Sequence, residues 1–276
     1  MKRSLKIGNM NFNIGERTYI MGILNVTEDS FSDGGKYNTI EKAVAHAKLM
    51  EAEGADLIDI GGESTKPNFK RVDEKEELLR VIPIIEALKS EINIPISIDT
   101  YKAKVAEAAL AKGASMINDV YGFKMDPAMA KVAAEYQVPC CLMHNRSNTN
   151  YKNIMNDIKL ELLESINIAK AAGVKEENII LDPGIGFGKN YEQNLIVINN
   201  LGLLSALNFP VLLGCSRKSV IGNTLGLPTL ERLEGTLATS VIGILKGCDF
   251  LRVHDVLENK RVAIMTDTIR KQPIFY

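Results

Sequence analysis

The stretch Ala55-Asp56-Leu57-Ile58-Asp59-Ile60-Gly61-Gly62-Glu63-Ser64-Thr65 contains the unit from which the chain is built. Its apolar run, residues 56–60, follows one glycine and precedes a glycine pair, which is typical of a short strand buried on both faces. An amphipathic segment, residues 73–91, comes next and leads to a second apolar run at 94–99. The stretch therefore predicts a strand, a loop, a helix and a further strand.

The same alternation repeats on both sides of this unit. The other apolar runs that we interpret as strands cover residues 19–26, 94–99, 116–120, 139–143, 179–182, 211–213 and 250–253. Helices are expected at about 39–53, 73–91, 102–112, 127–137, 153–172, 191–207, 229–246 and 256–271. Eight strand–helix pairs in a row predict an α/β fold, a (β/α)8 TIM barrel. A doubly wound open sheet is the alternative, and so many units without a domain break favour the barrel.

Short alternating segments also precede the first of these strands. Residues 4–16 carry Gly8, Asn9 and Gly15 between them, which indicates a small β-hairpin that could close the N-terminal end of the barrel. We therefore expect one domain over residues 1–276, with the hairpin in 1–17 and the barrel in 18–276.

Composition limits the classes of function. Of 276 residues, 46% are hydrophobic and 24% are charged, which excludes disordered and fibrous proteins. A net charge of -1 and the absence of Trp argue against nucleic-acid partners. The sequence shows neither a signal peptide nor a long apolar segment, so we expect a cytoplasmic protein without a membrane partner. The four cysteines lie in apolar surroundings and are expected to be buried, reduced thiols.

Polar residues end the predicted strands. In a parallel barrel the carboxyl ends of all strands meet at one mouth, where the loops build the active site. One such residue alone could be a helix cap, but a polar ending on every strand indicates a site for a polar, planar ligand and an anion. These residues are Asn25, Asp59, Asp99, Asn118, His144, Asp182, Ser216, Arg252 and His254.

Two loops at this mouth, residues 27–35 and 61–68, are rich in glycine and hydroxyl residues. Such loops can close over a ligand and open again, although they could also be merely long, solvated connections between strand and helix.

Two other motifs only superficially resemble nucleotide-binding sequences. Pro183 precedes the glycines at 184, 186 and 188, which lack dinucleotide-binding spacing, and Lys218 lacks the preceding glycine of a nucleotide P-loop.

With these features together, the sequence resembles the dihydropteroate synthase family. Two of the matching motifs are Asp59-Ile60-Gly61-Gly62-Glu63-Ser64-Thr65 and Asp182-Pro183-Gly184-Ile185-Gly186-Phe187-Gly188-Lys189. The matching blocks occur in order along almost the whole chain, at residues 22–27, 29–35, 59–65, 97–100, 117–120, 142–144, 182–189, 214–219 and 252–255.

The resemblance implies a transferase of folate biosynthesis. The family condenses 6-hydroxymethyl-7,8-dihydropterin diphosphate with 4-aminobenzoate, giving 7,8-dihydropteroate and diphosphate, and sulfonamides compete with aminobenzoate. The resemblance also implies Mg²⁺ as cofactor, small-molecule substrates and a homodimer through the later helices.

The resemblance assigns roles to residues of this sequence. Catalysis would depend on Asp99, Lys218, Asn25, Arg252 and His254. The pterin would bind at Asp99, Asn118, Met143, Asp182, Phe187 and Lys218. Diphosphate would bind at Asn25, Lys66, Arg252 and His254, with Mg²⁺ on Asn25. Aminobenzoate would bind at Thr65, Pro67, Phe187, Ser216 and Lys218, and the first loop would contribute Phe31 and Asp33.

The chain departs from the family pattern in both loops. Glu28 stands where the family usually has proline, and Lys66-Pro67-Asn68 stands where Arg-Pro-Gly is usual. Two alternatives stay open. A pterin-dependent methyltransferase would share Asp99, Asn118 and Asp182 without needing the diphosphate residues, and a non-catalytic pterin-binding paralogue is favoured only by the loop departures.

Overall fold

The computed structural model describes residues 4–26, 36–63 and 71–273, and the side chains of helix α1 from residue 40 onward. Both loops named above lie mostly outside this range. The roles expected of Phe31, Asp33, Thr65, Lys66 and Pro67, and the departures at Glu28 and Asn68, therefore fall outside the described residues.

The described strands form a closed parallel ring. In spatial order the sheet runs β8-β7-β6-β5-β4-β3-β10-β9, and all pairs are parallel. A parallel bridge between Leu181 and Val211 joins the two ends of this order. Closure confirms the barrel and excludes the open sheet. The strands are β3 (Tyr19–Asn25), β4 (Leu57–Gly61), β5 (Ile96–Asp99), β6 (Met116–Asp119), β7 (Cys140–Met143), β8 (Ile179–Asp182), β9 (Leu212–Leu213) and β10 (Phe250–Val253).

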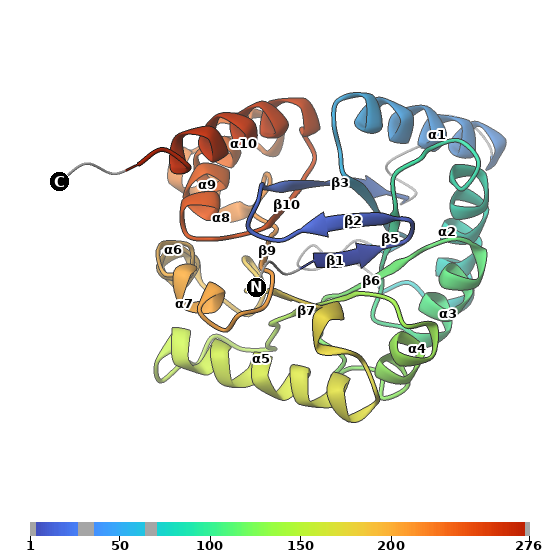
Figure 1. Ribbon diagram of the computed structural model, residues 1–276, viewed down its shortest axis with the longest axis horizontal. Coiled ribbons are helices and arrows are strands. Elements are labelled where there is room, and N and C mark those ends of the chain that lie inside the picture. Colours follow the sequence, from blue (N-terminus) through green and yellow to red (C-terminus); the bar gives the residue numbers. More distant parts are fainter. Residues whose placement is uncertain (1–3, 27–35, 64–70, 274–276) are drawn as a thin grey trace.

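Helices surround the strands on the outside (Figure 1). They are α1 (Lys36–Ala52), α2 (Glu74–Leu88), α3 (Ala103–Lys112), α4 (Met129–Tyr136), α5 (Ile154–Ala171), α6 (Tyr191–Asn199), α7 (Gly202–Ser205), α8 (Ser219–Leu225), α9 (Leu233–Leu245) and α10 (Val256–Arg270), with 3-10 turns η2 (Glu176–Asn178) and η3 (Thr229–Glu231). Each α-helix has an apolar side packed on the barrel, and the main core fills the layer between helices and strands.

The sequence prediction was wrong at two places in this layer. Residues 191–207 form two helices because Asn200 ends the first, its side-chain Nδ2 donating to the Ile196 carbonyl over 2.8 Å. Residues 229–246 begin with a 3-10 turn, and α9 starts only at Leu233. Helix α8 was not predicted, because its seven residues are too few to show a helical period.

The N-terminal hairpin closes one end of the barrel, as expected. Strands β1 (Ser4–Ile7) and β2 (Met10–Asn13) pair antiparallel. The hairpin lies across the centre of the ring in Figure 1. Phe12 of β2 packs edge-on against Tyr19, with 4.8 Å between ring centroids, and Phe250 lies 5.9 Å from Phe12. These side chains belong to an apolar plug inside the barrel, so the opposite mouth is left for binding.

Two further expectations concern the cysteines and the membrane. All four cysteines are buried and free, which confirms the reading of the sequence. In the part of the chain that the structure describes, every helix is too short or too polar to cross a bilayer.

Candidate active site

The polar strand endings lie at one level of the barrel. Parallel register places Asp99 of β5 beside Gly61 of β4 and beside Asn118 of β6. On the next strands, Met143 of β7 is the partner of Asp182 of β8. Because side chains alternate between the two faces of a strand, residues in register share the face that points into the mouth.

Arg252 bonds two other strands at this mouth, and a third joins them through Asp59. Its Nε donates to Asp59 Oδ2 and its Nη2 donates to Asp99 Oδ2, each over 2.6 Å. Asn118 Nδ2 donates to the same Asp59 oxygen over 2.9 Å. One cation, two carboxylates and one amide from β10, β4, β5 and β6 therefore form a single hydrogen-bonded group.

The charges in this group shift one another's protonation. Burial raises the pKa of Asp99 to about 7; Arg252 opposes the rise and Asp59 adds to it. For Arg252, burial alone would lower the pKa, but Asp59 and Asp99 together raise it, so the guanidinium stays charged. Asp99 consequently takes up a proton at a higher pH than an exposed aspartate does.

A second polar group lies on the β8 side of the mouth. Gly184 N–H donates to Asp182 Oδ1 over 2.6 Å, which orients this carboxylate. A Cβ built on Gly214 would lie 3.7 Å from Asp182 Oδ2 and 3.9 Å from Lys218 Nζ, so this glycine keeps the space beside both groups open. Burial raises the pKa of Asp182, whereas Lys218 and the Gly184 N–H lower it.

Lys218 and Phe187 form the adjoining wall. Lys218 Nζ lies 4.7 Å from the centroid of the Phe187 ring and donates to the Ile185 carbonyl. Burial lowers the pKa of Lys218, and the nearby Asp182 opposes this shift. An apolar ring beside a carboxylate and an ammonium group suits a flat heterocycle with polar edges.

The turn that carries Phe187 is held from behind. Lys189 is buried, and its Nζ donates to the Gly184 carbonyl over 2.8 Å and to the Phe187 carbonyl over 3.0 Å. It also lies 3.0 Å from His144 Nδ1. Burial and Lys189 lower the pKa of His144 to about 2, so its imidazole is neutral and Nδ1 can accept. Gly184 has a φ of 68°, and a side chain there would collide with the His144 carbonyl.

His254 and Ser216 lie on the β9–β10 side. Ser216 Oγ is 3.0 Å from His254 Nδ1 and accepts from the His254 N–H over 3.2 Å. Next to them, Arg217 Nε donates to Asp255 Oδ2 over 3.0 Å. Asn25 ends β3 and is the register partner of Gly61. It is partly exposed, so it can reach a ligand.

The structure therefore brings the described candidates to one mouth. They are Asn25, Asp99, Asn118, Met143, Asp182, Phe187, Ser216, Lys218, Arg252 and His254. The sequence placed Asp59 among the polar strand endings without a specific role, and it gave Lys189 no role, yet both organise these residues. Lys189 could have been found as the cation directly after the glycine turn.

Asn25 is the residue of this mouth that could hold Mg²⁺. Among the described residues, no group of three or more His, Cys, Asp or Glu side chains could hold a metal ion. The amide oxygen of Asn25 is a type of ligand that Mg²⁺ accepts, and Mg²⁺ commonly binds through one or two protein ligands together with substrate phosphates. The residues present thus fit a metal ion that binds with a phosphorylated substrate.

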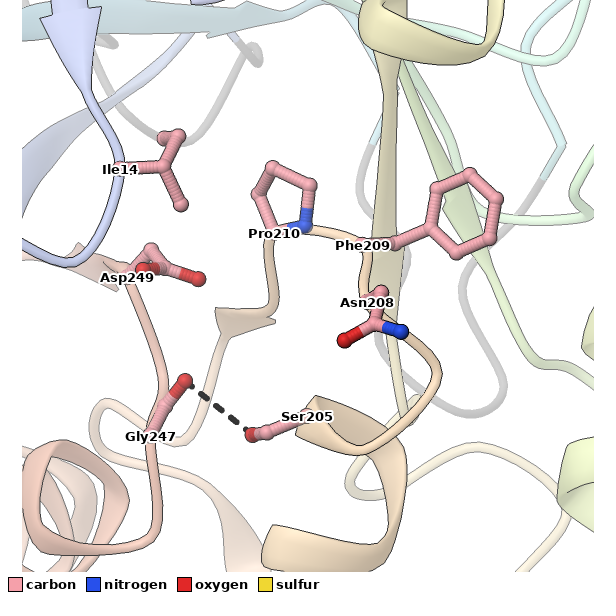
Figure 2. A pocket seen from close by; sticks show the side chains of 7 residues that line it. All are labelled: Ile14, Ser205, Asn208, Phe209, Pro210, Gly247 and Asp249. Carbon is pink, nitrogen blue, oxygen red and sulfur yellow. Dashed lines mark hydrogen bonds between the residues drawn. The ribbon is translucent and has the colours of Figure 1, made fainter. Parts of the chain in front are cut away.

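A separate hollow lies at the other end of the barrel. It has a volume of about 390 Å³ and is lined by Ile14, Ser205, Asn208, Phe209, Pro210, Gly247 and Asp249. Figure 2 shows Ser205 Oγ donating to the Gly247 carbonyl across it, over 3.1 Å. Its lining contains one carboxylate and no cation, so it does not suit an anionic ligand.

Comparison with known proteins agrees with the geometry of the mouth. The family model described as "Pterin binding enzyme" matches residues 21–254. Dihydropteroate synthase from Clostridium beijerinckii is 66% identical over 96% of this chain and 99% of its own length. A Clostridium difficile dihydropteroate synthase crystallised in the presence of pteroic acid has a TM-score of 0.93 at 56% identity, covering 95% of this chain and all (100%) of its own. The Xanthomonas albilineans synthase with 4-aminobenzoic acid has a TM-score of 0.94 at 39% identity, covering 99% and 100%.

Proposed function

The chain belongs to the pterin-binding enzymes and, within them, to the dihydropteroate synthase family, and from this membership we propose how its residues carry out the reaction. The reaction joins 6-hydroxymethyl-7,8-dihydropterin diphosphate to 4-aminobenzoate in folate biosynthesis, releasing diphosphate. The observation that carries the proposal is Arg252, which lies between Asp59 and Asp99 in the same mouth as Asp182 and Lys218.

Asp182, Asn118 and Lys218 bind the pterin. A carboxylate can accept two parallel N–H bonds from the amino-pyrimidinone edge of a pterin, and Asp182 is already oriented by the Gly184 N–H. Asn118 bonds a neighbouring ring nitrogen, and Lys218 donates to the opposite, carbonyl-bearing edge. Phe187 and Met143 enclose the ring, and Asp99 faces its other side.

Arg252, His254 and Asn25 bind the diphosphate. The guanidinium carries five N–H donors in a fork, and its bonds to Asp59 and Asp99 leave donors for a phosphate oxygen. Bound Mg²⁺, held through Asn25, would neutralise charge that develops on the leaving oxygens. The cations of the chain contribute in the same direction, which is an effective way for an enzyme to lower this barrier.

We propose an SN1-like path for the bond exchange. The electron-rich dihydropterin expels diphosphate and leaves a cationic methylene group, which anionic Asp99 stabilises. The amine of 4-aminobenzoate then attacks this carbon and forms the new C–N bond. The attacking amine then releases its proton to water, and no covalent enzyme intermediate is required.

Aminobenzoate approaches from the side of Ser216 and Phe187. Ser216 is buried in the loop after β9, and Phe187 already lies beside Lys218 Nζ. A sulfonamide, which has a similar shape, would compete for this place.

We also propose that the chain forms a homodimer through its later helices and acts in the cytoplasm. Apolar side chains are exposed on α9 and α10, namely Ile242, Leu245, Ile264, Met265 and Ile269. Helices α9 and α10 pack against each other, and exposed apolar side chains gathered on neighbouring helices are typical of protein interfaces.

Diphosphate release tests the proposed function. The purified chain is incubated with Mg²⁺ and the pterin diphosphate, with and without 4-aminobenzoate, and both diphosphate and dihydropteroate are measured. We expect stoichiometric formation of the two products only when both substrates are present. Pterin binding without turnover would instead support the non-catalytic paralogue, and methyl transfer from an N-methylated pterin, supplied in a parallel assay, would support the methyltransferase.

A further inference from the structure

Asp59 is fully buried, with 0% of its surface exposed, yet it touches residues from both halves of the site. Its Oδ2 accepts from Arg252 Nε over 2.6 Å and from Asn118 Nδ2 over 2.9 Å. We propose that Asp59 is a positioning residue that sets the side chains of Arg252 and Asn118 together, and so couples binding of the diphosphate to binding of the pterin ring. This inference rests on the proposed function.

Burial separates the role of Asp59 from that of a substrate ligand. With no exposed surface, it acts on bound molecules through Arg252 and Asn118 only. Removing one partner of a buried charge pair is strongly destabilising, because the other charge is left uncompensated. Arg252 therefore keeps its Nε on Asp59 while its other donors turn toward the ligand.

The strand that carries Asp59 makes this positioning rigid. Asp59 lies within β4, where its register partners are Ile23 of β3 and Ser97 of β5. Asn118 and Arg252 likewise lie on strands, β6 and β10. Side chains on strands are placed more precisely than side chains on loops, so one carboxylate can fix a guanidinium and an amide relative to each other.

Asp59 also acts on the ionisation of Asp99. Its negative charge raises the pKa of Asp99, as do Glu77 and Asp119, whereas Arg252 lowers it; Lys218 faces the same carboxylate. If Asp59 loses its charge, Arg252 has only Asp99 left as its carboxylate partner in this group. The loss of the Asp59 charge and the closer pairing of Arg252 with Asp99 both lower the pKa of Asp99, so Asp99 stays anionic to lower pH. A purely structural role of Asp59 would not produce this shift.

The test compares Asp59→Asn with Ser97→Ala. Ser97 is buried on the neighbouring strand, and its Oγ has no hydrogen-bond partner within the described structure, so its removal disturbs the same layer without touching Arg252 or Asn118. Calorimetry measures binding of 6-hydroxymethylpterin and of inorganic diphosphate with Mg²⁺ separately. We expect Asp59→Asn to weaken both by roughly tenfold or more, because each ligand loses one aligned charge-assisted partner. Ser97→Ala should bind both as the wild type does.

The pH profile of kcat/KM supplies the second readout. In Asp59→Asn the acid limb should move to lower pH, and in Ser97→Ala it should stay in place. Unchanged binding of either ligand, or an unmoved acid limb, would overturn the inference. A wild-type chain that makes no dihydropteroate would contradict the proposed function itself. This outcome is distinct from those that would contradict the role of Asp59.

A measurement on the wild type covers the case in which Asp59→Asn does not fold. The Arg252 Nε–H resonance, assigned by its loss in Arg252→Lys, should exchange slowly with water in the free chain and after diphosphate binding. Exchange as fast as that of surface arginines in either state would contradict a lasting bond to Asp59.

Discussion

Lys189 Nζ lies 3.0 Å from His144 Nδ1, and this contact joins the glycine turn after β8 to the end of β7. The same Nζ donates to the carbonyls of Gly184 and Phe187, at the two ends of the turn. This glycine turn also orients the Asp182 carboxylate, because the Gly184 N–H donates to it. A buried lysine thus holds both ends of the turn that lines the proposed pterin pocket.

Lys189→Met should weaken pterin binding. Methionine fills a similar volume but donates no hydrogen bond, so the turn loses three contacts and Phe187 and Asp182 lose their alignment. We expect KM for the pterin diphosphate to rise roughly tenfold or more, since each lost buried contact costs about 1 kcal/mol or more. KM for aminobenzoate should change less. Lys170→Met removes an exposed ion pair to Glu176 and should leave both values unchanged.

Asp182→Asn should lower kcat/KM by roughly 10- to 1000-fold. The amide keeps the size of the carboxylate but turns one of its two acceptor oxygens into a donor, which opposes an N–H of the pterin edge. A hydrogen bond to a charged group contributes about 1.5–3 kcal/mol, and two such bonds are affected. Steady-state kinetics measures the loss, and thermal unfolding is the control. If kcat/KM stays within about twofold of the wild type, Asp182 does not bind the pterin edge.

Much of the fold could be predicted because glycines and polar endings bound each apolar run. Strand β9 spans only Leu212–Leu213 and still came within the expected run at 211–213. Helix α8 could not be predicted, because its seven residues are too few to show a helical period. Its support comes from outside the helix, since Arg232 donates to the Leu227 and Arg217 carbonyls on either side of it. Such long-range support leaves no periodic signal in the sequence.

For the site, position along the chain was easier to predict than connection in space. Asp99, Asn118 and Arg252 were expected at one mouth on the rule that parallel strands share their carboxyl ends. Asp59 bonds two of them because of the strand register and because of which oxygen faces which donor. Neither of these can be predicted from the types of the residues alone. Lys189 was part of a recognised motif, but its direction, inward toward His144, follows from the positive φ of the glycines before it.

Activity should fall on the acid side of neutrality. Burial raises the pKa of Asp99 to about 7, and the anionic form is the one that stabilises a cationic methylene group. Below that pH the carboxylate protonates, so kcat/KM should fall by about tenfold per unit; above it, kcat/KM should level off. Asp99→Asn should be slow at every pH and lack this limb. If kcat/KM of the variant falls on the acid side in the same way, the titrating group belongs to the substrate and not to Asp99.

Asp119→Ala should destabilise the chain without a comparable loss of catalysis per folded molecule. Asp119 is fully buried and accepts from the N–H groups of Tyr121 and Phe123, each over 2.8 Å. Leaving two such donors unpaired costs about 1–3 kcal/mol each, partly offset because burial raises the pKa of Asp119 to about 7. We expect a net loss of roughly 2 kcal/mol or more by urea denaturation. Asp73→Ala, which removes an exposed cap of α2, should cost only about 1 kcal/mol.

Ile264→Asp should convert the proposed homodimer into monomers. Ile264 and Met265 are exposed on α10 at 58% and 61%, and α10 packs against α9, which exposes Leu245. A carboxylate at position 264 would have to lose its water in an apolar interface without a partner, which costs several kcal/mol. Analytical ultracentrifugation should give the wild type a mass of twice 30.4 kDa and the variant a mass of 30.4 kDa. Leu160→Asp changes an apolar residue on α5 that is 51% exposed and should leave the dimer intact. If Leu160→Asp and Ile264→Asp dissociate it alike, the interface does not lie on the later helices, because the effect would then follow surface charge and not position.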